Sequence, residues 1–126
     1  MRVPDEVIDE NGHVNNVAYV QWMQDVAIRH FRALGGEEAL GESGATWVAR
    51  AHRIEYLRPA FAGDALEIAT WIADVGRVSS KRCYEFFRAG EEKPLARGET
   101  DWVLVDIASG RPKRIPENLH ALFKRG

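Results

Sequence analysis

One stretch with a helical repeat, followed by four stretches typical of β-strands, limits what this chain can fold into. Over residues 16–34 the apolar residues recur every three or four positions, which is the period of an amphipathic α-helix. Asn15 is a favourable N-cap, and Gly35-Gly36 is a favourable C-terminal stop. We therefore predict one long helix over residues 16–34.

β-Branched and aromatic residues dominate four runs downstream of this helix, and turn residues separate them. The runs cover residues 46–58, 64–75, 79–88 and 94–106. Such short connections imply antiparallel hairpins. Residues 2–8 are a candidate fifth strand, placed at an edge or a bulge because Pro4 lacks an N–H group. Short helices are expected over residues 37–45 and from Pro116, where Leu119, Leu122 and Phe123 would pack on the sheet.

One helix covers only part of such a sheet. A helix is about 10 Å wide and strands lie about 4.8 Å apart, so one helix covers about two strands and the sheet must curl around it. In the last run Ala96, Gly98 and Thr100 share a face, and their small side chains would let the helix approach closely. We expect a partner subunit to cover apolar residues elsewhere. These include Trp71, Phe87 and Val103.

The composition argues against several functional classes. The formal net charge of −2 gives no electrostatic footprint for nucleic acid. No apolar run has the length of a membrane span, and the polar first residues are unlike a signal peptide. Cys83 is the only cysteine, which suits a reducing compartment. We expect one domain over residues 1–126, located in the cytoplasm, and neither metal nor cofactor, because no motif for either occurs.

A carboxylate lies next to the expected helix start, in the run Asp9-Glu10-Asn11-Gly12-His13-Val14-Asn15-Asn16. The first N–H groups of a helix have no partner within it and carry partial positive charge, so they favour a developing oxyanion. An aspartate is ionised at neutral pH and can attack a carbonyl carbon or deprotonate water. These groups together are a candidate acyl-transfer centre.

Three segments of the sequence together resemble a known family, the hotdog-fold acyl thioesterases. The segments are Asp9-x-Asn11-x-His13-Val14-Asn15-Asn16-x-x-Tyr19-x-x-Trp22, Ile54-Glu55-Tyr56-x-Arg58-Pro59-x-x-x-Gly63-Asp64 and Gly110-Arg111-Pro112-x-x-Ile115-Pro116. The 4-hydroxybenzoyl-CoA thioesterase-like branch is the most similar, and the first segment also resembles plant acyl-carrier-protein thioesterases. The resemblance implies an α+β hotdog fold, with a five-stranded antiparallel sheet wrapped around one long helix. It also implies homodimers, which often pair into tetramers.

The resemblance further implies hydrolysis of an acyl-CoA or acyl-carrier-protein thioester, a reaction of lipid metabolism. Asp9 would be the catalytic carboxylate, as nucleophile or general base, and the backbone N–H of Asn16 would hold the thioester oxygen. His13 is a candidate for orienting the substrate or polarising its carbonyl, and Asn11 for positioning water or Asp9. Each also has a structural alternative: Asp9 and His13 as partners of turn amides, and Asn11 as a left-handed turn residue.

Two other functions stay open at this stage. One is a hotdog hydratase or dehydratase acting on a CoA or carrier-protein thioester, although its motifs are not found here. The other is a non-catalytic protein that binds acyl thioesters. Several basic residues are candidates for contacting the phosphates of coenzyme A, and a solvated surface explains them equally well. They are Arg77, Lys81, Arg82, Lys113 and Arg114.

Overall fold

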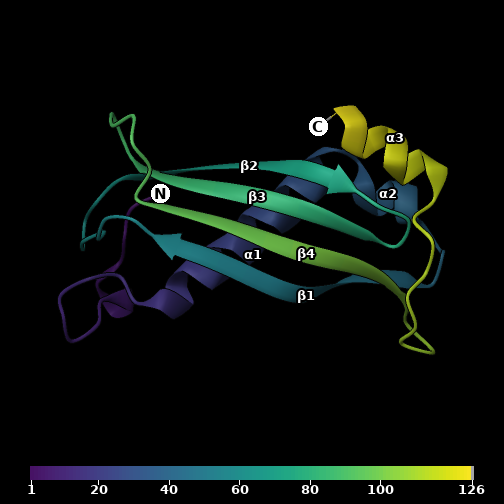
Figure 1. Cartoon of the computed structure of the whole chain (residues 1–126), viewed down its shortest axis with the longest axis horizontal. Coiled ribbons are helices and arrows are strands. Elements are labelled where there is room, and N and C mark those ends of the chain that lie inside the picture. Colours follow the sequence, from purple (N-terminus) through teal and green to yellow (C-terminus); the bar gives the residue numbers. More distant parts are fainter. Residues whose placement is uncertain (126) are drawn as a thin grey trace.

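The computed structural model describes residues 1–125, in which a helix lies across one face of a four-stranded antiparallel sheet (Figure 1). The helix is α1 (Asn16–Ala33), and the strands follow the order β1-β4-β3-β2. The strands are β1 (Ala45–Tyr56), β2 (Leu66–Val75), β3 (Ser79–Arg88) and β4 (Ala96–Asp106). Shorter elements are the 3₁₀ turn η1 (Asp5–Val7) and the helices α2 (Gly36–Leu40) and α3 (Glu117–Arg125). The α+β class and all four strand runs are confirmed.

The expected fifth strand over residues 2–8 is wrong. After Pro4 the chain makes the turn η1, and Arg2 forms only an isolated bridge with Ala65, next to β2. Proline has a fixed φ and no N–H group, so a ladder of hydrogen bonds does not continue through it. The sheet therefore has four strands, crossed on one face by an 18-residue helix, instead of five strands wrapped around one long helix.

The start of α1 is fixed by the side chain of Asn15. Its Oδ1 atom accepts a hydrogen bond from the Ala18 N–H at 2.9 Å, and its Nδ2 atom donates to the Val7 carbonyl at 2.9 Å. At the other end, Gly35 adopts a φ of 81°, a left-handed conformation that glycine tolerates without strain. The predicted N-cap and stop are confirmed, and the helix ends one residue before the predicted boundary.

Replacing this cap should weaken the whole fold measurably. We expect Asn15→Ala to lower the free energy of unfolding by about 1 kcal/mol, because the Ala18 N–H loses its acceptor. Asn15→Ser loses the bond to the Val7 carbonyl as Asn15→Ala does, but it keeps an oxygen acceptor for the Ala18 N–H and should retain more of the stability. Urea denaturation of the three proteins measures the difference. An equal loss in both variants would contradict the capping role.

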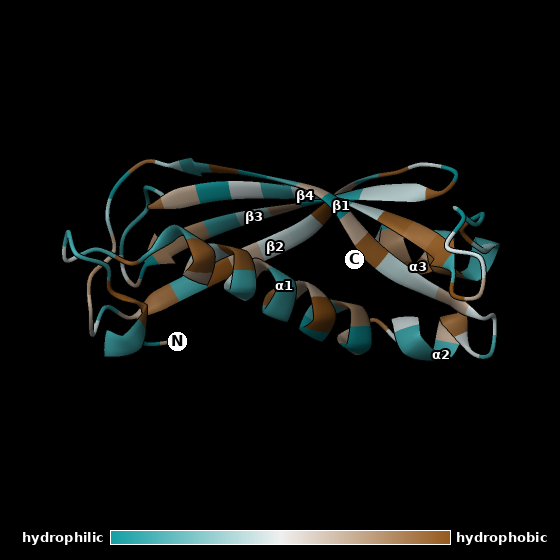
Figure 2. Ribbon diagram, turned by 90° about the horizontal axis from the view of Figure 1, so that it is seen from below, coloured by the Kyte–Doolittle hydropathy of each residue, from teal (hydrophilic) through white to brown (hydrophobic). Residues whose placement is uncertain are grey.

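α1 crosses one face of the sheet (Figure 2), and its Met23 side chain packs against the backbone of β4 at Gly98. Met23 is fully buried, and a Cβ atom built on Gly98 would lie 2.8 Å from its Sδ atom. Ala96 and Thr100, which flank Gly98 on the same face, are also fully buried. This confirms that small residues on one face of the last strand let the helix pack close to the backbone.

α2 and α3 lie together at the end of the sheet where α1 finishes (Figure 1). α3 starts after Pro116, as predicted, and buries Leu119 and Phe123 against Leu104 of β4. α2 is shorter than the expected helix over residues 37–45, because Gly41 has a φ of 51° and interrupts the helical conformation. No helix within residues 1–125 is long and apolar enough to cross a membrane.

The face of the sheet opposite α1 carries no helix within residues 1–125 (Figure 2). Trp71 is 38% exposed there, and Phe87 is half-buried. The expectation that Val103 is uncovered is wrong, because this side chain is only 5% exposed. β1 is an edge strand of the sheet, and its pairing with β4 is shifted by one residue between Ala49 and Ala51, a β-bulge.

Candidate functional site

Asp9 lies in a tight loop directly before α1. A bridge between Ile8 and Val14 closes this loop, and the Asp9 N–H donates to the His13 carbonyl at 2.8 Å. Oδ1 of the Asp9 side chain accepts hydrogen bonds from the N–H groups of Asn11, at 2.9 Å, and His13, at 3.2 Å. Within residues 1–125 no donor is bonded to Oδ2. The Asp9 side chain is exposed. Two N–H groups hold its Oδ1 atom, and its Oδ2 atom is available to a substrate or to water.

The structure brings the other predicted site residues to the same end of α1. His13 is exposed, and its ring meets the edge of Phe61 with ring centroids 5.4 Å apart. Asn16 is the first residue of α1, and its N–H has no hydrogen-bond acceptor within the described chain. Asn11 is exposed and does not adopt the left-handed conformation considered for it, which Gly12 adopts instead with a φ of 77°.

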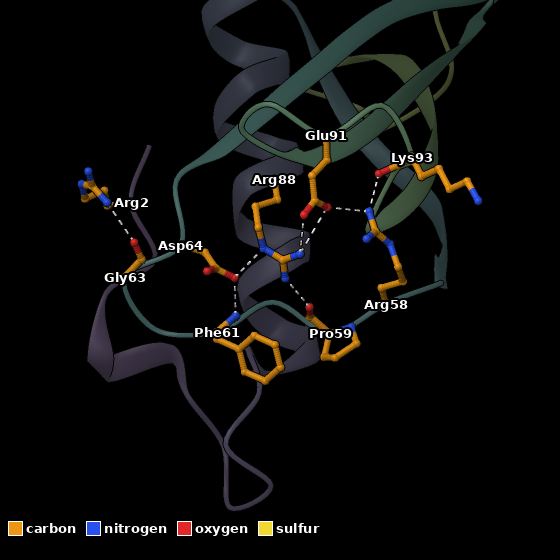
Figure 3. Close-up of polar contacts among 9 residues, drawn as sticks. All are labelled: Arg2, Arg58, Pro59, Phe61, Gly63, Asp64, Arg88, Glu91 and Lys93. Carbon is orange, nitrogen blue, oxygen red and sulfur yellow. Dashed lines mark hydrogen bonds and ion pairs between the residues drawn. The ribbon is translucent and has the colours of Figure 1, made fainter.

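An ion-pair cluster lies beside this loop, with Arg88 at its centre (Figure 3). Nε of Arg88 lies 3.2 Å from Oδ2 of Asp64, and Nη1 lies 3.1 Å from Oε2 of Glu91. Nη2 donates to the Pro59 carbonyl at 3.1 Å. Arg58 approaches Glu91 from the other side at 2.9 Å. The cluster thus ties the loop between β1 and β2 to the end of β3.

This cluster supports the candidate site through the loop between β1 and β2. Oδ2 of Asp64 accepts from the Phe61 N–H at 2.9 Å, which fixes the residue whose ring contacts His13. One residue earlier, the Ala60 carbonyl accepts from the Val14 N–H at 3.0 Å. The Arg58-to-Asp64 segment of the family resemblance is therefore a positioning element for the Asp9 loop. Arg88 and Glu91 were not anticipated, since nothing in their spacing predicted this contact.

The cluster makes a pH-dependent contribution to stability. The hydrogen bonds from Arg88, and then that from Arg58, lower the pKa of Glu91 below its ordinary value of 4.5. A lowered carboxyl pKa stabilises the fold fully above the ordinary value, and this stabilisation is lost as the pH falls through the lowered one. We expect Glu91→Gln to be less stable than the wild type at neutral pH, and the difference to shrink as the pH falls below 4.5 and through the lowered pKa.

Urea denaturation at neutral pH and at acid pH below 4.5 measures this difference in the free energy of unfolding. Glu92→Gln is the control, because Glu92 is exposed and forms no ion pair within residues 1–125. A stability difference between Glu91→Gln and the wild type that stays constant with pH would contradict the role of the ionised carboxylate.

Three cavities of the described chain lie away from the Asp9 loop. One opens on the sheet face opposite α1, one lies between α1 and the start of β2, and one lies under the C-terminal half of α1. None of the three is lined by Asp9, Asn11, His13 or Asn16. In the single chain the candidate site is therefore part of the open surface.

Comparison with known proteins assigns the chain to a family. The model of the thioesterase-like superfamily matches residues 3–123. The chain belongs to this superfamily. No curated protein matches the sequence.

Solved structures resemble this thioesterase-like chain over nearly its whole length. The PA5185 protein from Pseudomonas aeruginosa is 23% identical, with a TM-score of 0.88, over 99% of this chain and 87% of that one. The gentisyl-coenzyme A thioesterase BH1999 is 20% identical, with a TM-score of 0.83, over 98% and 97%. The 1,4-dihydroxy-2-naphthoyl-CoA thioesterase Slr0204 from Synechocystis is 17% identical, with a TM-score of 0.85, over 98% and 92%. At these identities the likeness establishes the hotdog-type fold.

Proposed function

We propose that this member of the thioesterase-like superfamily hydrolyses an acyl-CoA or acyl-carrier-protein thioester to the free acid and the thiol. One observation carries the proposal. The Asp9 carboxylate is oriented by two turn N–H groups through Oδ1 and keeps Oδ2 available, in a loop that leads directly into α1. A fixed carboxylate close to a helix N-terminus combines a nucleophile or base with a site for negative charge.

The proposed chemistry divides between the carboxylate and the helix start. Asp9 either attacks the thioester carbonyl carbon, forming an anhydride that water then cleaves, or removes a proton from the water that attacks. In both routes the C–S bond breaks and the sulfur leaves as a thiolate that takes up a proton. The carbonyl oxygen gains negative charge on the way, and a preorganised donor at this point contributes roughly 3–4 kcal/mol.

Asn16 is the proposed donor. The Asn15 side chain accepts from the N–H of Ala18 and not from that of Asn16. The Asn16 N–H has no acceptor within residues 1–125, so it is available to the substrate oxygen. His13, steadied by Phe61, is proposed to orient the substrate, and Asn11 to position the water.

The proposal includes a homodimer, or a tetramer of two dimers. The candidate site is open in one chain, and the edge strand β1 exposes Val48 at 42% and Tyr56 at 47%. A second copy joined at this edge would cover these residues and help to enclose the substrate. The proposed setting is cytoplasmic lipid metabolism, since the single cysteine suits a reducing compartment.

A substrate panel tests the proposal. The names of two structural neighbours include aromatic acyl groups, gentisyl and dihydroxynaphthoyl, so aryl-CoA thioesters belong beside aliphatic acyl-CoA and acyl-carrier-protein substrates. We expect thiol release, detected with a thiol reagent, from at least one class. Hydration of an enoyl-CoA without thiol release would instead indicate a hydratase. Binding of an acyl-CoA in calorimetry with no turnover across the panel would indicate a binding protein.

A further inference from the structure

The cavity under the C-terminal half of α1 is separate from the Asp9 loop. Its volume is about 340 Å³, and α1, α2, α3, β1, β3 and β4 contribute to its walls, α2 through Glu37 and Leu40. Most of its lining is apolar, including Phe31, Trp47, Trp102 and Phe123. Phe31 follows Asn16 by fifteen residues, roughly 22 Å along a helix. Within one chain the cavity and the candidate catalytic loop are therefore distinct places.

Arg82 brings a positive charge into this apolar cavity. The side chain is on the inner face of β3, and the residue is only 4% exposed. No carboxylate lies within ion-pair distance of it among residues 1–125. Burial lowers the pKa of Arg82, in keeping with the cost of removing a cation from water without a counter-ion.

Neutral groups hold the guanidinium in place. Nη1 of Arg82 contacts Nδ1 of His30 at 2.8 Å and donates to Oγ1 of Thr70 at 3.1 Å. A guanidinium only donates, so Nδ1 of His30 must accept, which makes this imidazole neutral with its proton on Nε2. Burial, and then the charge of Arg82, lower the pKa of His30, which also favours the neutral ring. Thr70 is oriented in turn because its hydroxyl donates to the Cys83 carbonyl at 3.0 Å.

Several donor groups that line the cavity are not hydrogen-bonded within residues 1–125. Nε and Nη2 of Arg82 have no hydrogen-bond acceptor within residues 1–125. The indole N–H of Trp47, which also lines the cavity, is buried and has no partner in the same part of the chain. A planar, prearranged guanidinium with free N–H groups matches a carboxylate. The apolar walls match an organic body, whereas a small hydrated anion such as phosphate would leave them unfilled.

We propose that this cavity binds a carboxylate carried on a small apolar body, an aromatic or medium-chain aliphatic acid, with Arg82 as its counter-ion. The rim gives access from solvent, since Ile28 is 45% exposed and the ion pair between Arg32 and Glu37 is at the surface. The ligand is a free acid, because a medium-chain acyl group held at the Asp9 loop is too short to span the roughly 22 Å to this cavity. This site does not depend on Asp9.

Binding of matched acids and neutral compounds tests the proposal. Benzoate is compared with benzamide and octanoate with octan-1-ol, each titrated by calorimetry and by tryptophan fluorescence, to which Trp47 and Trp102 at the cavity contribute. We expect at least one acid to bind and to raise the melting temperature, with its neutral match at least tenfold weaker. Acetate and inorganic phosphate should bind weakly, because neither fills the apolar walls. Equal binding of acids and neutral compounds by the wild type, or none by either, would overturn the proposal.

Two variants locate the binding. Arg82→Met keeps most of the side-chain length without the charge and should weaken acid binding at least tenfold, leaving neutral compounds unaffected. Arg50→Met removes an exposed arginine outside the cavity and should leave acid binding unchanged. Undiminished acid binding in Arg82→Met would refute the assignment. If Arg82→Met does not fold, the comparison of acids with neutral compounds in the wild type still decides.

Kinetics separates this site from the Asp9 loop, in an arm that rests on the proposed function. Arg82→Met should leave KM for hexanoyl-CoA and for adipoyl-CoA unchanged, because the cavity binds a free acid away from the thioester. A raised KM for adipoyl-CoA alone would show that the cavity holds the end of an acyl group and would overturn this assignment. Octanoate or benzoate should bind Asp9→Asn as well as wild type, so loss of catalysis and loss of this site are distinguishable.

Discussion

Asp9→Asn is expected to reduce kcat/KM for thioester hydrolysis at least roughly a hundredfold with the fold intact. An asparagine keeps a carbonyl oxygen that can accept the hydrogen bonds now made by Oδ1 of Asp9 with the N–H groups of Asn11 and His13. The loop should therefore hold its shape. The amide can neither attack the thioester carbonyl carbon nor take a proton from water, so the chemical step loses its main group.

Two further variants separate the chemistry from the structure. Asp5→Asn removes another exposed carboxylate from the same N-terminal segment and should leave turnover unchanged. Asp9→Ala removes the turn hydrogen bonds as well, so it should also lower the melting temperature. Thiol release gives the rates, and circular dichroism gives the folded state. Near-normal turnover in folded Asp9→Asn would remove Asp9 from the proposed mechanism.

Phe86→Ala is expected to lower the free energy of unfolding by about 3–5 kcal/mol. Phe86 is fully buried on the inner face of β3, and its ring meets Tyr19 edge to face with centroids 5.1 Å apart. Removing the ring takes apolar surface out of the core and leaves a cavity that its neighbours fill only in part. This is a large share of the stability of a domain of this size.

The neighbouring phenylalanine is a matched control. Phe87 follows in the same strand but points to the opposite face and is only half-buried, so Phe87→Ala should cost clearly less. Phe86→Leu fills most of the space and should cost less than Phe86→Ala. Urea denaturation measures all three variants. If Phe87→Ala lowered the free energy of unfolding as much as Phe86→Ala, this would contradict the assignment of Phe86 to the buried face of β3 and of Phe87 to the opposite face.

Periodic patterns predicted the main elements well. The helix boundary differs by one residue, and β3 matches its predicted range, because these segments repeat one pattern over many positions. The strand expected over residues 2–8 failed because Pro4 outweighed a short apolar pattern. The alternation of β3 could also have predicted that Arg82 is buried, since Arg82 lies two and four residues before the buried Tyr84 and Phe86 and so shares their face of the strand. Its charge led to a surface assignment instead.

The candidate site was predictable only where it is contiguous in sequence. Asp9, Asn11, His13 and Asn16 gather because one loop and one helix start contain them all. The ion cluster that supports this loop was not predictable, since Asp64, Arg88 and Glu91 come from separate turns and strands. Opposite charges are common on surfaces, and Asp64 meets Arg88 only because β2 pairs with β3 so that Leu66 lies opposite Arg88.

The bulge in β1 protects its unpaired edge from indiscriminate association. A regular edge strand offers an even row of N–H and C=O groups to any extended chain, which is how sheets begin to aggregate. At Ala49 to Ala51 that row is interrupted, and the exposed Arg50 adds a positive charge at the same point. An incoming strand must tolerate both the local twist and the charge, which selects against flat, apolar or basic segments of other proteins.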